Sequence, residues 1–146
     1  MTNTTTISCI LDTTNPAATL GFEAWIDDQK FFDTNHVQGQ QQVVVEIADD
    51  DDGDHELRFV LKNKTSDHTQ VDGAGNIVSD ATLTITDLAF DEIKLGHMVT
   101  EQTVYTHDFN GTGELTQDKF YSEIGCNGTV SLKFSTPIYL WLLEHM

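Results

Sequence analysis

The chain has 146 residues, of which 24 are acidic and 7 are basic, so its formal net charge at pH 7 is −17. Surfaces that bind phosphates need clustered Lys and Arg, and this excess of negative charge therefore argues against a nucleic-acid partner. No stretch approaches the roughly 20 apolar residues of a membrane helix, and the N-terminus lacks the basic and apolar regions of a signal peptide. We therefore expect one soluble domain spanning residues 1–146, with no membrane partner. Its localisation is left open, the extracellular space included.

Alternation of apolar and polar residues predicts β-strands in the first part of the chain. Ile7, Cys9 and Leu11 fall on one face of a first strand. Residues 20–33 are predicted to form a hairpin, because two strand-like segments flank the turn-forming Asp-Asp pair at 27–28.

The remaining alternating segments complete an all-β fold. Residues 42–47 and 56–61 are predicted to pair across the aspartate-rich run between them. Two further strands are predicted at 81–86 and 88–95, the second with a break typical of a bulge. The last two predicted strands are residues 99–109 and 129–134. Short strands at this spacing, separated by turn residues, predict two antiparallel sheets packed face to face as a jelly-roll-like β-sandwich.

The last ten residues differ from the rest of the chain. Thr136 and Pro137 offer an N-cap and a first-turn proline ahead of the apolar segment IYLWLL, which favours a short C-terminal helix over a final strand. Two roles for its apolar side chains remain open. They either close one end of the sandwich or, with Trp141 and Leu142 exposed, serve an oligomer contact.

Two cysteines, Cys9 and Cys126, lie far apart in the sequence. They could form a disulfide only if their strands were neighbours in the fold. Because no secretion signal is recognisable, we expect free buried thiols rather than a disulfide.

Acidic residues cluster in segments that invite comparison with calcium sites. Residues 107–120 copy part of an EF-hand loop, but Lys119 stands at the twelfth position, where a bidentate Glu is expected, so we interpret the segment as a hairpin or loop. The aspartate run at 49–54 is interpreted as a solvated turn, with calcium binding as the alternative if a neighbouring loop adds ligands. Residues 63–80 form such a loop. Its candidate calcium ligands are Asn63, Asp67, Asp72 and Asp80.

Trp25 is the candidate for stacking on a sugar ring. It is out of phase with Phe22, Ala24 and Ile26, so if those residues face the core, Trp25 faces outward. The other interpretation is that a covering element buries it. His55 is the second candidate, because it opens a predicted strand directly beside the acidic run.

Three segments in order, GFEAWIDDQKFF, HELRFVLKN and SDATLTITDLAFDEIKL, resemble the calcium-dependent xylan-binding carbohydrate-binding modules over about residues 20–95. The resemblance implies a β-sandwich that binds a polysaccharide or another glycan with calcium as its cofactor. It places Asp80 at a metal-binding aspartate of that family. Lys64 stands where the family has Asp, and residues 81–82 (Ala-Thr) replace its Arg-Asn pair. The C-terminal segment GCNGTVSLKFSTPIYLWLLEHM resembles small uncharacterised proteins of marine cyanophages, which implies a virion component.

Motifs of catalysis are not found in the sequence. The six histidines form no HxH or HExxH arrangement, and there is no GxSxG, phosphate-binding glycine loop or dinucleotide fingerprint. We therefore predict that the protein is not an enzyme but a carbohydrate-binding β-sandwich assisted by calcium. The alternative is a structural or accessory subunit of a phage virion, acting through contacts with virion proteins or with further copies of itself.

Overall fold

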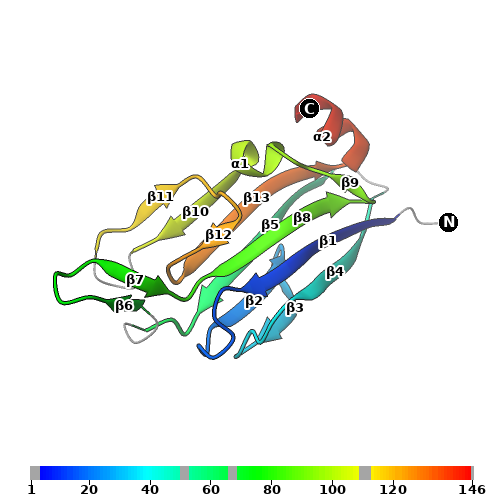
Figure 1. Cartoon of the computed structure of the whole chain (residues 1–146). Helices are drawn as coiled ribbons and strands as arrows, with labels where there is room; N and C mark the ends of the chain where they lie inside the picture. The colour runs from blue at the N-terminus through cyan, green and yellow to red at the C-terminus, as the bar shows by residue number, and fades with distance from the viewer. Residues whose placement is uncertain (1–3, 50–52, 66–68, 109–112, 146) are drawn as a thin grey trace.

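The computed structural model describes residues 4–49, 53–65, 69–108 and 113–145. Two antiparallel sheets form a sandwich, which confirms the predicted fold class, and a short helix lies at one end of it (Figure 1). In spatial order, one sheet contains β12 (Glu123–Ile124), β8 (Leu83–Phe90), β1 (Thr4–Thr13) and β4 (Gln41–Ala48), with β9 (Ile93–Lys94) paired to β8. The six-stranded sheet contains β11 (Thr116–Asp118), β10 (Thr103–His107), β13 (Gly128–Thr136), β5 (Gly53–Lys62), β2 (Gly21–Ile26) and β3 (Gln29–Thr34).

Among the described residues, four short elements lie outside these two sheets. A separate hairpin is formed by β6 (Thr69–Val71) and β7 (Ile77–Asp80). The helices are α1 (Met98–Gln102) and α2 (Ile138–His145). In the described part of the chain, neither helix has the length and apolar character needed to cross a membrane.

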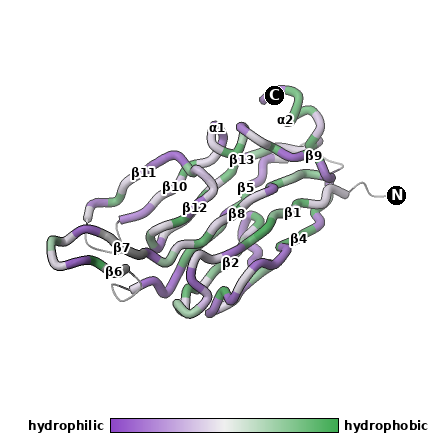
Figure 2. Tube along the Cα trace, in the orientation of Figure 1, coloured by the Kyte–Doolittle hydropathy of each residue, from purple (hydrophilic) through white to green (hydrophobic). Residues whose placement is uncertain are grey.

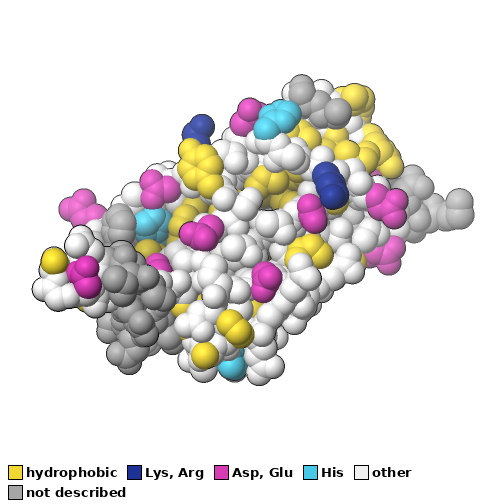
Figure 3. Space-filling view, in the orientation of Figure 1, with side chains coloured by type: hydrophobic (Ala, Val, Ile, Leu, Met, Phe, Trp, Pro, Cys, Tyr) yellow, Lys and Arg dark blue, Asp and Glu magenta, His cyan; other side chains and the backbone are white. Residues whose placement is uncertain are grey.

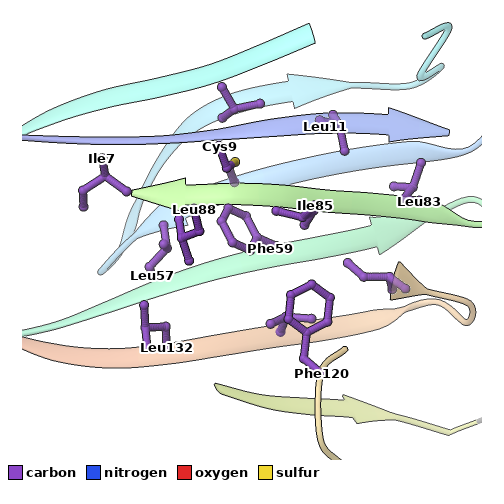
Figure 4. Packing of buried hydrophobic residues seen from close by; sticks show 14 of the residues in the cluster. Ile7, Cys9, Leu11, Leu57, Phe59, Leu83, Ile85, Leu88, Phe120 and Leu132 are labelled. Carbon is purple, nitrogen blue, oxygen red and sulfur yellow. The ribbon is translucent and has the colours of Figure 1, made fainter. Parts of the chain in front are cut away.

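The core lies between the two sheets, where each strand contributes every second residue. β1 buries Ile7, Cys9 and Leu11, the face that alternation predicts, and Leu57 and Phe59 of β5 face them from the other sheet (Figure 4). Hydrophobic and hydrophilic residues accordingly alternate along the strands (Figure 2). Burial of these side chains provides the main driving force for folding, at about 1.5–3 kcal/mol for each large apolar side chain.

The predicted pairing of residues 42–47 with 56–61 is wrong. β4 pairs with β1 in one sheet, whereas β5 lies between β13 and β2 in the other. The acidic connection between β4 and β5 therefore carries the chain from one sheet to the other. Alternation predicts which residues face the core, but it carries no information about which strand is the neighbour.

The strands predicted at 81–86 and 88–95 are largely one strand, β8. It contains a register shift opposite Cys9, where Asp87 has a left-handed φ of 54°. The predicted bulge in the second segment is instead a tight turn, formed by Asp91 and Glu92 with φ values of 51° and 72°, which leads into β9. Asp tolerates positive φ better than most residues, so Asp87 and Asp91 suit their positions.

The predicted strand at 99–109 begins with a helix. Residues Met98–Gln102 form α1, and only Thr103–His107 form the strand β10. The buried Met98 anchors this turn to the core. β10 pairs with β11, with His107 opposite Thr116, so the hairpin interpretation of residues 107–120 is confirmed. Residues 109–112 lie outside the described part of the chain.

The predicted C-terminal helix is confirmed as α2. Its Ile138, Trp141 and Leu142 are buried, so these side chains close one end of the sandwich. The N-terminus of α2 is capped by a residue that is distant in the sequence. The Oδ1 of Asp49 accepts a hydrogen bond from the Ile138 N–H at 2.8 Å, and its Oδ2 accepts one from the Thr5 hydroxyl at 2.6 Å. Asp49 is therefore a buried structural residue, which corrects its interpretation as part of a solvated turn. Residues 50–52 of the run lie outside the described part.

Both cysteines are free thiols, as expected. Burial raises the pKa of Cys9 to about 12 and also raises the pKa of Cys126, which is only partly buried. Because the thiolate is the reactive form, we expect Cys126 to be alkylated much faster than Cys9 in the folded protein at mildly alkaline pH. Mass spectrometry after timed iodoacetamide treatment would measure this, and equal rates for the two cysteines would contradict it.

Candidate functional site

Trp25 lies on the outer face of the six-stranded sheet, which is turned away from the core. The residues before and after it in β2 are buried, whereas Trp25 is partly exposed, as the alternation predicts. Its Nε1–H donates a hydrogen bond to Glu23 Oε1 at 3.0 Å. In the register of the sheet, Trp25 is paired with Lys30 on β3 and with Arg58 on β5. The indole therefore has a polar partner at its edge and a basic residue on each flanking strand.

Both of these basic residues approach the face of the indole ring. The Arg58 Cζ lies 5.2 Å and the Lys30 Nζ lies 5.7 Å from the ring centroid. These distances are within the range of cation–π attraction. Lys30 also donates a hydrogen bond to Asp33 Oδ2 at 2.9 Å, which fixes its ammonium group near the ring. Together these contacts favour a single orientation of the Trp25 ring.

An ion-pair network continues from Trp25 along the same sheet face. The Lys62 ammonium bonds Glu23 Oε2 at 2.8 Å and Asp33 Oδ1 at 2.6 Å. The hydrogen bond from Lys62 is the main cause that lowers the pKa of Glu23 and of Asp33, so both carboxylates stay ionised at neutral pH. Such pairs at the surface contribute little to stability, because water and salt screen them. Their larger effect is to balance charge locally in a chain that is strongly acidic overall.

His55 lies in a cleft of about 670 Å³ between α2 and the adjoining ends of β5 and β13. Its Nδ1 is 2.8 Å from Asp27 Oδ2, and its ring stacks on Phe134 with centroids 5.5 Å apart. Burial acts to raise the pKa of Asp27, but hydrogen bonds from His55 and from the Glu56 backbone N–H lower it overall. The cleft is lined by Asp27, Asp54, His55, Glu56, Lys133, Phe134, Ser135, Trp141, Glu144 and His145.

Arg58 connects this cleft with Trp25. One guanidinium nitrogen donates a hydrogen bond to the Asp27 carbonyl at 2.7 Å, while the guanidinium carbon lies over the Trp25 ring, 5.2 Å from its centroid. The Arg58 Nε lies 3.5 Å from Glu56 Oε1 but makes no hydrogen bond with any residue that the structure describes. The two predicted sugar-binding residues, Trp25 and His55, are thus linked through Asp27 and Arg58.

The described residues among those predicted to bind calcium each have other neighbours or partners. Asn63 follows β5 with a left-handed φ of 68°, and its side chain packs against Gly21. Asp72 lies in the turn between β6 and β7, where Oδ1 accepts hydrogen bonds from the N–H groups of Ala74 at 2.9 Å and Asn76 at 3.0 Å. Asp80 ends β7, and its carboxylate bonds the Lys64 ammonium at 2.7 Å. Asp67 lies outside the described residues.

Comparison with known proteins supports the fold assignment. No protein-family model matches the sequence, and no curated protein matches it either. The solved selenomethionine structure of vCBM60 superposes with a TM-score of 0.56 over 88% of this chain and 89% of that chain. It was described in connection with an evolutionary link, by circular permutation, between two families of calcium-dependent carbohydrate-binding modules. In fold, the chain resembles a carbohydrate-binding module. The two sequences are 12% identical, so the likeness establishes the fold alone.

In the structure, the carboxylates of Asp72 and Asp80 are engaged by other groups of the chain. Calcium takes about six to eight oxygen ligands. The Asp80 carboxylate instead bonds the ammonium of Lys64, and the Asp72 carboxylate accepts hydrogen bonds within its own turn. The described residues include no group of three or more His, Cys, Asp or Glu side chains that could hold a metal ion. Because Asp67 is not among them, the four-residue site as a whole stays a prediction.

Several residues of the candidate site are not among those that the sequence analysis predicts. Lys30 could have been found, because the predicted hairpin at 20–33 brings its second strand beside Trp25. Arg58 and Asp27 could not, because their contacts depend on the pairing of β2 with β5, which is distant in sequence. The cleft residues of α2 depend on how that helix docks against β13, which no local pattern encodes.

Proposed function

We propose that this protein is a non-catalytic carbohydrate-binding module that binds a polysaccharide or glycan through Trp25, with His55 and its cleft as the adjoining polar site. The observation that carries the proposal is the partly exposed Trp25 on the outer sheet face, held in orientation by Arg58 and Lys30. The carbohydrate-binding-module fold of vCBM60 supports it as well.

The chemistry of these side chains suits a sugar. The C–H groups of a pyranose ring pack on a flat aromatic surface, and its hydroxyl groups need hydrogen-bonding partners around that surface. Trp25 supplies the flat surface once the flexible side chains of Arg58 and Lys30, which lie over its ring, move aside for the sugar. Glu23, Lys62 and Arg58 supply charged donors and acceptors beside it. A ligand that extends from Trp25 past Arg58 reaches the open cleft with His55.

Replacing Trp25 by alanine is expected to weaken glycan binding by about 10–100-fold, because the loss of a stacked aromatic surface costs roughly 1.5–3 kcal/mol. Affinity electrophoresis in gels containing xylan, galactan or β-glucan would identify a bound polysaccharide, and calorimetry with its oligosaccharides would give the affinity. Trp25→Phe keeps an aromatic ring and should retain most of the binding. Val104→Ala, an exposed position on the same sheet face, is the matched control and should change nothing.

Two results would overturn this proposal. The first is wild-type protein that shows no retardation with any of the three polysaccharides or on a broad glycan array. The second is a Trp25→Ala variant that binds as well as the wild type. Running each gel with CaCl₂ and with chelator would at the same time test whether calcium assists the binding.

A second candidate function is a structural subunit that acts through protein contacts. The observation that favours it is the apolar outer side of α2, where Tyr139, Leu140 and Leu143 are 55%, 58% and 69% exposed. Hydrophobic side chains gather at this end of the molecule (Figure 3). Such a patch is typical of contact surfaces. Light scattering that finds an oligomer, which Leu140→Glu converts to a monomer without loss of glycan binding, would support this function beside the first.

A further inference from the structure

Lys64 is a buried lysine, although lysine is almost never fully buried unless it is paired. It follows β5 by two residues, and its side chain is 1% exposed. The ammonium donates hydrogen bonds to Asp80 Oδ1, at 2.7 Å, and to the Gly125 carbonyl oxygen. A charge removed from water in this way is costly unless oxygen ligands compensate it, and here a carboxylate and a carbonyl do so.

The backbone of Lys64 is fixed as firmly as its side chain. Its N–H donates to Asn127 Oδ1 at 2.9 Å, and its carbonyl accepts from Asn127 Nδ2 at 2.8 Å. Asn127 and Gly125 both belong to the connection between β12 and β13, whereas Asp80 ends β7 just before β8. Lys64 therefore joins three connections at one end of the sandwich, and these connections come from distant parts of the sequence.

Carboxylate and carbonyl oxygens are also the ligands that calcium prefers in proteins. At this point of the fold they converge on a positive charge that belongs to the chain itself. We propose that the Lys64 ammonium takes the place that a bound metal ion would occupy at this end of the sandwich. The stability of the fold therefore does not depend on calcium. This inference concerns the fold and does not rest on the proposed glycan binding.

Thermal melting of the wild-type protein and of Lys64→Met tests the inference. The wild-type Tm should be the same in millimolar CaCl₂, in chelator, and in NaCl of equal ionic strength. Lys64→Met keeps the length of the side chain but removes the charge, leaving Asp80 without its ammonium partner, and should lower the Tm by about 5–10 °C. Lys94→Met is the matched control. Its side chain is 69% exposed and it pairs with Asp87 only at 3.4 Å, so its Tm should stay close to that of the wild type.

Lys64→Asp provides the complementary test. It places a second carboxylate beside Asp80 and the Gly125 carbonyl, so the variant should be destabilised by like-charge repulsion in chelator and recover stability when calcium is added. A wild-type Tm that calcium raises beyond the effect of NaCl would overturn the inference. So would an unchanged Tm in Lys64→Met, or a folded Lys64→Asp that is indifferent to calcium. If Lys64→Asp does not fold, the wild-type and Lys64→Met measurements decide.

Discussion

Replacing Trp141 by alanine is expected to lower the free energy of unfolding by about 3–5 kcal/mol, among the largest effects of any single substitution in this chain. The side chain is 4% exposed and reaches both sheets. Its ring centroid lies 5.8 Å from that of Phe90 on β8 and 6.3 Å from that of Phe134 on β13. The substitution would leave a cavity between the two sheets, because neither strand can move inward without breaking its own ladder of hydrogen bonds.

Urea denaturation followed by far-ultraviolet circular dichroism would measure this effect without relying on tryptophan fluorescence. Leu143→Ala is the control on the same helix. Leu143 is 69% exposed, so its replacement should change the free energy of unfolding by no more than about 0.5 kcal/mol. If the two variants were equally stable, α2 would not be docked against the sandwich as the structure has it.

Local patterns in the sequence predict a large part of this fold. Alternation predicts the buried face of β1 and β2, because successive side chains of a strand point to opposite sides and only one side faces the core. The Asp-Asp pair at 27–28 predicts the turn between β2 and β3, and Asp27 adopts the left-handed φ of 51° that such a turn requires. For the same reason, the outward direction of Trp25 could be predicted from its phase alone.

Contacts between distant segments could not be predicted in this way. The period-two pattern of β4 and β5 is compatible with a hairpin, yet the two strands belong to different sheets. The contacts of Lys64 could not be predicted from local patterns either. A lysine soon after a predicted strand is visible in the sequence, but the convergence of Asp80 and Gly125 on its ammonium depends on three connections that meet only in the folded chain. The guanidinium of Arg58 above Trp25 depends likewise on the pairing of β2 with β5.

Asp49 is the residue at which the sequence was most misleading, because a run of aspartates is normally solvated. In the structure it is 8% exposed and joins the N-terminus of α2 to β1. Replacing Asp49 by alanine is therefore expected to lower the free energy of unfolding by about 2–4 kcal/mol, since it removes the helix cap, leaves the Ile138 N–H without its side-chain acceptor, and leaves the Thr5 hydroxyl only its longer contact of 3.4 Å with Asp91 Oδ2.

The variant Asp49→Asn tests whether the loss of hydrogen bonds causes this destabilisation. The amide of Asn keeps an oxygen that can accept from the Ile138 N–H, and its NH₂ group can donate to the Thr5 hydroxyl, so the loss should fall to about 1 kcal/mol. Asp28→Ala, an exposed aspartate in the turn between β2 and β3, should have almost no effect. Urea denaturation of the three variants would rank them. If Asp49→Ala were as mild as Asp28→Ala, the first aspartate of the run would be solvated after all and the cap of α2 would have to come from another residue.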